Sequence, residues 1–138
     1  MNASSSESTL QEHMALLARV VARFVSSGLM THEIDTRGVE KFLGTKEDMA
    51  LFADVLTWML DEGIIRAKGA SKNLNGVMHL TGAQLTAKGL SIVKQPLPTG
   101  DTVEKRIQNA DGGNSTWSNI GDLIGGIAGG LIKSVSSG

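Results

Sequence analysis

The chain lacks cysteine and tyrosine, and it contains only two prolines and three histidines in 138 residues. Without cysteine, a disulfide scaffold, a thiolate metal site and a cysteine nucleophile are all excluded. No run of about 18 apolar residues occurs, and the polar, serine-rich start does not resemble a secretory signal. We therefore expect a cytoplasmic protein, and the length is that of a single domain.

Charge and glycine are unevenly distributed, although the formal net charge is only −1. Residues 1–62 carry five basic and ten acidic side chains, whereas residues 63–100 carry five basic side chains and no acidic one. Nine of the 17 glycines fall in the last 39 residues. The basic middle segment and the glycine-rich tail therefore differ in character from the rest of the chain.

The spacing of apolar residues predicts a mainly α-helical fold with a small β-hairpin. A first helix is expected over residues 9–26, where Ser8 or Thr9 can cap it and Gly28 can end it. A short helix over residues 37–43 and a longer helix over residues 45–62, capped by Thr45, follow it. Extended runs over residues 64–68 and 77–80 then form a hairpin with a loop of about eight residues, and Thr86 caps a last helix before Pro96.

Two short motifs within this order of elements resemble the winged-helix family. The first is residues 60–66 (LDEGIIR), where Gly63 follows the long helix and leads into a strand. The second is residues 84–90 (QLTAKGL), which is similar to the entry into the helix after the wing in many bacterial regulators. The resemblance covers residues 9–95 and implies a winged-helix domain there.

The resemblance also implies DNA binding, with the third helix in the major groove and the wing on the backbone. The third helix departs from that pattern, because residues 45–62 carry five carboxylates and only one basic side chain. The candidate nucleic-acid contacts are therefore Lys46, at the amino-terminal end of the third helix, and the basic residues of the wing and its surroundings, Arg66, Lys68, Lys72 and Lys88. The alternative interpretation is that these side chains only keep the wing solvated.

The tail has the pattern of a glycine-rich amphipathic helix over residues 117–135. Its apolar stripe consists of Trp117, Ile120, Leu123, Ile124, Ile127, Leu131 and Val135. Gly121, Gly125 and Gly129 form a row beside the stripe, where another helix can approach closely. Five glycines inside the helix cost about 4–5 kcal/mol relative to alanine, so we expect the helix to need a surface on which to fold.

Three surfaces can serve the tail helix: the core of the same chain, a second copy, or a membrane. Packing within the chain and self-association have similar weight. A membrane is the weakest of the three, because the stretch is short, contains Asp122 and has a single basic residue. The predicted organisation is thus a disordered start over residues 1–8, a winged-helix domain over 9–95, a linker with a short helix over 96–116, and the tail helix.

No constellation of catalytic or metal-binding residues is present in the sequence. The only local histidine–carboxylate cluster is His32, Glu33 and Asp35, which we expect in a solvated loop. We therefore expect no enzyme, metal, cofactor or small-molecule substrate.

Two hypotheses of function remain. The leading hypothesis is a winged-helix interaction or regulatory module that binds itself or another protein through the tail stripe. The alternative is a small DNA-binding regulator that dimerises through the tail and contacts phosphates with its basic wing.

Overall fold

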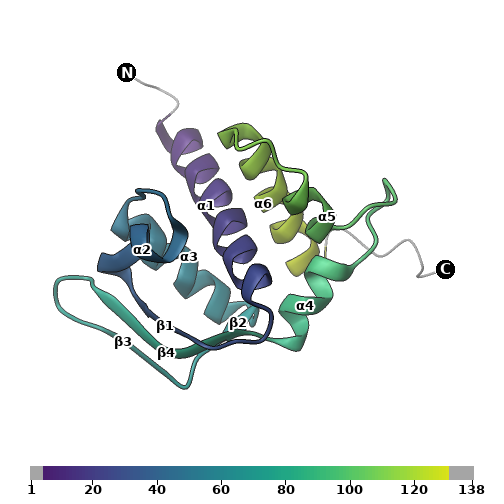
Figure 1. Cartoon of the computed structure of the whole chain (residues 1–138). Helices are drawn as coiled ribbons and strands as arrows, with labels where there is room; N and C mark the ends of the chain where they lie inside the picture. Colours follow the sequence, from purple (N-terminus) through teal and green to yellow (C-terminus); the bar gives the residue numbers. More distant parts are fainter. Residues whose placement is uncertain (1–4, 131–138) are drawn as a thin grey trace. The chain divides into compact units, whose positions relative to one another are not determined.

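A computed structural model of the chain describes residues 5–130 (Figure 1). Six α-helices and a small antiparallel sheet of four strands make up this part, which confirms the expectation of a mostly helical chain with a small sheet. The elements are α1 (Ser5–Ser27), β1 (His32–Asp35), the short 3-10 helix η1 (Thr36–Gly38), α2 (Val39–Leu43), α3 (Met49–Asp61), β2 (Ile65–Arg66), β3 (Gly69–Lys72), β4 (Met78–Leu85), α4 (Ala87–Lys94), α5 (Val103–Gln108) and α6 (Asn114–Ala128). None of the described helices is long and apolar enough to cross a membrane.

The chain divides into two compact units. Unit 1 comprises the residues up to Ala22 and those from Ser91 onward, and unit 2 comprises residues 23–90. Helices α1 and α4 therefore each contribute to both units. The sequence pattern groups the first helix with residues 9–95, whereas in the structure most of α1 belongs to the same unit as α6.

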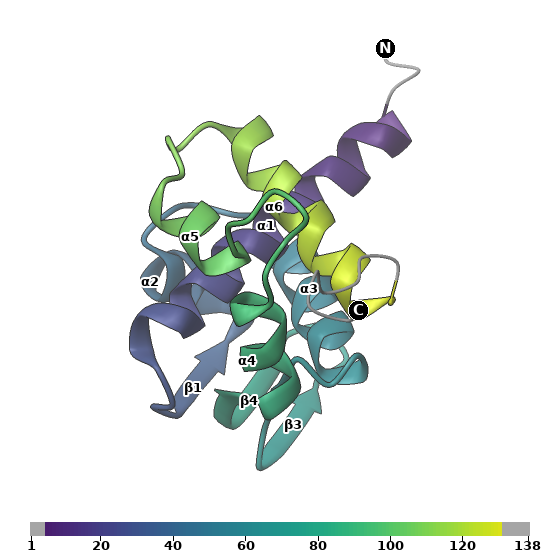
Figure 2. The same ribbon diagram turned by 90° about the vertical axis from the view of Figure 1, so that its right-hand side faces the viewer.

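The sheet of unit 2 is built around β4, which pairs antiparallel with β1 on one side and with β2 and β3 on the other. Figure 2 shows β1, β4 and β3 side by side. Buried and exposed side chains alternate from Met78 to Leu80, with His79 exposed between them. The sheet therefore has one face in the core of the unit and one face toward solvent.

The hairpin loop is shorter than the sequence predicts. Residues 69–72, which we expected in the loop, form β3, and only residues 73–77 connect it to β4. The error arises because Gly-Ala-Ser-Lys has low strand propensity, and pairing with β4 overrides that propensity. The second correction in the sheet is β1, because His32 was expected in a loop.

The helix starts also need correction, because other residues act as the caps. Helix α1 begins at Ser5, ahead of the predicted caps Ser8 and Thr9. Helix α3 begins at Met49, and its cap is Asp48, whose carboxylate accepts from the amides of Ala50 (2.8 Å) and Leu51 (3.0 Å). Asp48, which lies inside the helix predicted over residues 45–62, is thus itself the cap, and the predicted cap Thr45 is wrong.

The joint between α3, β2 and α4 follows the second sequence motif closely. Thr86 caps α4, because its hydroxyl accepts from the amide of Gly89 at 3.0 Å. The same hydroxyl lies 2.5 Å from the carbonyl oxygen of Gly63, to which it donates. A Cβ at Gly89 would lie 2.3 Å from the carbonyl oxygen of Ile64, so only glycine allows this approach of α4 to the chain before β2. Both predictions, the cap at Thr86 and the helix stop at Gly63 (φ 75°), are confirmed.

Unit 1 contains the packing of α6 on the first part of α1. Ile120, Ile124 and Ile127 of α6 are buried, and a Cβ at Gly121 would lie 2.0 Å from the carbonyl oxygen of Met14. Helix α6 begins three residues earlier than predicted and reaches Ala128. The close approach that the glycine row predicts is therefore made within one chain, at Gly121.

The connection between α4 and α6 in unit 1 is held by polar contacts. Thr102 caps α5 by accepting from the amide of Lys105 at 3.1 Å. The Asp101 carboxylate accepts from the Arg106 guanidinium at 2.8 Å.

Candidate functional site

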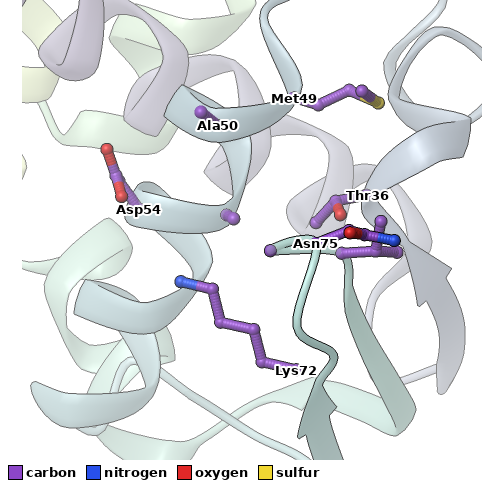
Figure 3. Close-up of a pocket in the computed structure, with 9 residues that line it drawn as sticks. Thr36, Met49, Ala50, Asp54, Lys72 and Asn75 are labelled. Carbon is purple, nitrogen blue, oxygen red and sulfur yellow. The ribbon is translucent and has the colours of Figure 1, made fainter.

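A cavity of about 210 Å³ opens between α3 and the end of the hairpin in unit 2, and we call it the wing cleft (Figure 3). It is lined by Thr36, Met49, Ala50, Ala53, Asp54, Lys72, Asn75, Gly76 and Val77. Figure 3 shows the Lys72 side chain extending from β3 toward α3, on the side where Asp54 lies. The cleft therefore combines a mainly apolar lining with one acidic and one basic group.

The loop that forms one wall of the wing cleft is folded by its own hydrogen bonds. The Asn73 side chain accepts from the amides of Asn75 (2.9 Å) and Val77 (3.0 Å), and Gly76 adopts a φ of 82° that favours glycine. This turn leaves Leu74 fully exposed at the tip. Leu74 is therefore an apolar side chain open to solvent on the turn that borders the wing cleft.

The solvent face of α3 is acidic. Asp54, Thr57 and Asp61 are exposed at helical spacing along one side, and the helix contains no basic residue. The expected helix over residues 45–62 is thus shortened to residues 49–61, and Lys46 lies outside it. A face of this kind would meet DNA phosphates with like charge.

The five candidate nucleic-acid contacts are exposed, but they differ in what they contact. Arg66 donates to the side-chain oxygen of Gln84 at 3.0 and 3.2 Å, and Lys88 donates to the carbonyl oxygen of Glu62 at 2.7 Å. The amide of Lys68 donates to β4, and its side-chain carbons lie over Gly82. Lys68 and Lys72 thus mark the two ends of β3, whereas Arg66 and Lys88 hold parts of unit 2 together.

The histidine–carboxylate cluster contains Glu33 and Asp35 as expected, but its histidine is His79 rather than His32. Alternation along β1 places Glu33 and Asp35 on the outer sheet face, where they lie 3.9 Å from the ring nitrogens of His79. Asp35 also binds Arg37 at 2.7 Å, and the hydrogen bonds from Arg37 hold the pKa of this carboxyl well below its usual range. Within residues 5–130, no group of three or more histidine and carboxylate side chains could hold a metal ion.

His32 lies on the opposite side of β1 from these carboxylates. Its ring packs edge-on against Phe24 and Phe42, with centroids 5.4 and 5.5 Å away. Burial, together with the positive charge of Arg23, lowers the pKa of His32. His32 therefore has a structural role in the core of unit 2 rather than a role in a solvated loop.

A second cavity, of about 310 Å³, lies beside this aromatic cluster. It is lined by Arg23, His32, Glu33, Asp35, Gly38, Lys41 and Phe42. Most of its charged groups are already engaged: Arg23 donates to the carbonyl oxygen of Phe42, and Glu33 accepts from the amide of Gly82.

The tail stripe is largely covered by unit 1 itself. Its three isoleucines are buried, and Trp117 and Leu123 are half-buried. The Arg19 guanidinium lies over the Trp117 ring, 5.1 Å from its centroid. Leu131 and Val135 lie outside the described residues. Whether the stripe also binds a second copy stays a prediction, but its central residues are occupied within the chain.

Comparison with protein-family models, curated proteins and solved structures finds no match for this chain. Similarity therefore supplies neither a family nor an activity.

The wing cleft and the exposure of Leu74 were not predicted from the sequence. The available signal was Asn73–Gly76, whose Asn and Gly residues are typical of a tight turn with one apolar residue inside it. The enclosure of the cleft by η1 and α3 had no local signal, because it depends on how distant segments pack.

Proposed function

We propose that the chain is a non-enzymatic protein-binding module of winged-helix architecture and that its partner docks at the wing cleft. The order of elements along the chain from α1 to β4 supports the architecture: helix, strand, short helix, longer helix and then an antiparallel hairpin. The joint at Thr86 and Gly89 adds support, since these residues belong to the motif that resembles the family.

The observation that carries the proposal is the acidic face of α3 beside exposed apolar side chains. Asp54 and Asp61 oppose a polyanion, whereas Leu74 is fully exposed and Met49 is about half exposed (49 %). Protein-binding surfaces combine apolar anchors with a polar rim. The wing cleft and its surroundings have this composition, with Lys72 and Asp54 as the polar groups.

The proposal keeps the protein-binding function of the leading sequence hypothesis and moves its site from the tail to the wing. The burial of Ile120, Ile124 and Ile127 in unit 1 supports the move. The DNA-binding alternative rests on Lys68 and Lys72, because Arg66 and Lys88 already donate to atoms of the same unit.

Photo-crosslinking in cells that produce the protein tests the proposal. A photoreactive benzoylphenylalanine replaces Leu74, and a matched variant carries it in place of the exposed Glu40 of α2. We expect a discrete protease-sensitive adduct from position 74 and none from position 40. A nuclease-sensitive adduct at position 74 would instead favour the DNA-binding regulator, and no adduct at either position would contradict both.

A further inference from the structure

Strand β3 has one unpaired edge. It pairs with β4 in the register Gly69 with Thr81, Ala70 with Leu80, Ser71 with His79, and Lys72 with Met78. In the part of the chain that is described, no strand pairs with its other side. All four residues of β3 are exposed.

The hydrogen-bond alternation of an antiparallel pair tells which backbone groups face that edge. The amide of Asn73 donates to the carbonyl oxygen of Val77 at 2.9 Å, so this is a hydrogen-bonded pair. Alternation then makes Ser71 and Gly69 hydrogen-bonded to β4 and leaves Ala70 and Lys72 between them. The amide of Met78, opposite Lys72, accordingly donates to the Thr36 hydroxyl at 3.0 Å rather than to β3. The amides and carbonyls of Ala70 and Lys72 therefore face outward.

The side chains of β3 leave this edge accessible. Gly69, Ala70 and Ser71 are small, so another backbone can approach within hydrogen-bonding distance. Lys68 and Lys72 stand at the two ends of the strand, in a segment of 38 residues (63–100) that contains no carboxylate. Lys68 and Lys72 oppose pairing with an identical strand, and their positive charges favour carboxylates beside the two ends of β3, whereas Asp54 opposes a carboxylate inside the wing cleft.

The wing cleft adjoins the same strand. Lys72 lies opposite the buried Met78 and therefore on the inner side of the sheet, and it also lines the cleft. Every second side chain of a strand added to β3 would lie on this inner side. Strand addition thus couples backbone pairing with side-chain recognition.

We propose that β3 captures an extended, acidic segment of a partner protein as an additional strand of the sheet. This inference rests on the proposed function and specifies its partner. The backbone groups of Ala70 and Lys72 supply the hydrogen bonds, and Lys68 and Lys72 select for carboxylates.

The first test uses a fluorescent peptide of about ten residues that alternates glutamate and valine, since valine favours strands. Its matched control alternates lysine and valine. We expect binding of the acidic peptide by fluorescence anisotropy, weakening with added salt, and no binding of the basic one. Absence of acidic-peptide binding up to about 1 mM, or equal binding of both peptides, overturns the inference.

The Ala70→Pro variant tests the backbone pairing directly. Proline removes the outward amide of residue 70, which makes no bond to β4, so the hairpin should keep its own ladder. We expect the acidic peptide to bind at least about tenfold more weakly, with the urea unfolding midpoint little changed. Unchanged affinity overturns strand addition.

A change in the peptide keeps the test decisive if Ala70→Pro disturbs the fold. Two versions of the acidic peptide carry N-methyl groups on alternate residues, one version on the odd positions and one on the even positions. Because each version can donate along only one edge, we expect one to lose binding and the other to retain it. Equal binding of both overturns the proposal.

Two further outcomes identify a different occupant. The first is a mixed-sequence DNA duplex that binds more tightly than the peptide. If the double substitution Lys68→Glu and Lys72→Glu lowers its affinity and Ala70→Pro does not, the ligand is nucleic acid and not a peptide. A dimer in light scattering that Ala70→Pro dissociates would make the occupant a second copy. The inference fails while the proposed function stands if the crosslink at position 74 to a protein persists in the Ala70→Pro chain.

Discussion

Gly121 in unit 1 and Gly89 in unit 2 each let a helix approach a backbone carbonyl so closely that no side chain fits. The added Cβ would lie 2.0 Å from the oxygen of Met14 in one case and 2.3 Å from that of Ile64 in the other. The surroundings differ. At Gly89 polar bonds from Thr86 reinforce the contact, whereas at Gly121 the described support is the burial of isoleucines and the stacking of Arg19 on Trp117.

This difference shows that the two contacts should fail in different ways. Helix α6 has a low intrinsic propensity because of its glycines, so it depends on apolar burial against unit 1. The joint at Thr86 is composed of several directional bonds, each of modest free energy. We therefore expect a substitution in the packing of α6 to cost a large part of the unfolding free energy at once, and a substitution at the Thr86 joint to cost only a part of it.

The largest effect is expected from a charge on the buried side of α6. Ile124→Asp places a carboxylate at a position with 0 % exposure, and we expect it to lower the free energy of unfolding by about 4 kcal/mol or more in urea titrations. Asn119→Asp, which adds the same charge at an exposed position of α6, should change it by less than about 0.5 kcal/mol. An Ile124→Asp chain that stays folded but falls in mass by light scattering would make the stripe an interface between copies, as the leading sequence hypothesis proposes.

The next effect separates two glycines of the same helix. Gly121→Ala should destabilise unit 1 by about 3 kcal/mol, because the new methyl group meets the Met14 backbone. Gly125→Ala has nothing within 4 Å of its new Cβ and should stabilise the protein by about 1 kcal/mol through helix propensity. Thermal or urea unfolding measures both, and equal changes would contradict the packing of α6 at Gly121.

A smaller loss is expected at the joint of unit 2. Thr86→Ala removes the cap of α4 and the donor to Gly63, and should cost about 1–2 kcal/mol of unfolding free energy. Thr86→Ser retains the hydroxyl and should keep most of this unfolding free energy. If serine and alanine have the same effect, the hydroxyl does not hold the joint.

The smallest effect concerns pH and unit 2 alone. Because the pKa of His32 is lowered in the folded protein, the unfolded chain binds this proton more readily. His32 therefore favours the folded state above its ordinary pKa of 6.5, and this contribution is lost as the pH falls. Urea unfolding between pH 8 and pH 5 should show a smaller decline for His32→Phe than for the original chain. The same decline in both would assign the pH dependence to other groups.

Local signals predicted several features correctly for identifiable reasons. Gly28 and Gly63 end helices with φ of 64° and 75°, because glycine alone adopts this conformation at little cost. Thr86 is predicted as a cap because it stands directly before the helix that follows the hairpin. Thr45 was chosen wrongly because Asp48, three residues later, satisfies the same chemistry.

The site was less predictable than the fold. The sequence identified Lys68 and Lys72 as basic residues of the hairpin. It could not predict the unpaired strand edge between them, because Gly-Ala-Ser-Lys has no strand pattern. The wing cleft brings Thr36, Asp54 and Val77 together from three separate segments, and no spacing in the sequence encodes that meeting.

The sequence by itself determined where helices end, which residues form the apolar stripe of α6, and that this helix needs a surface. These properties depend on backbone conformation and periodicity within a few residues. Only the tertiary structure decided that α6 packs within unit 1, that Gly121 alone of the predicted row meets another element, and that β3 keeps an open edge. Those outcomes depend on contacts between segments far apart in the chain. Several glycines and strands have the same local pattern, but only one arrangement of the segments packs without voids or clashes.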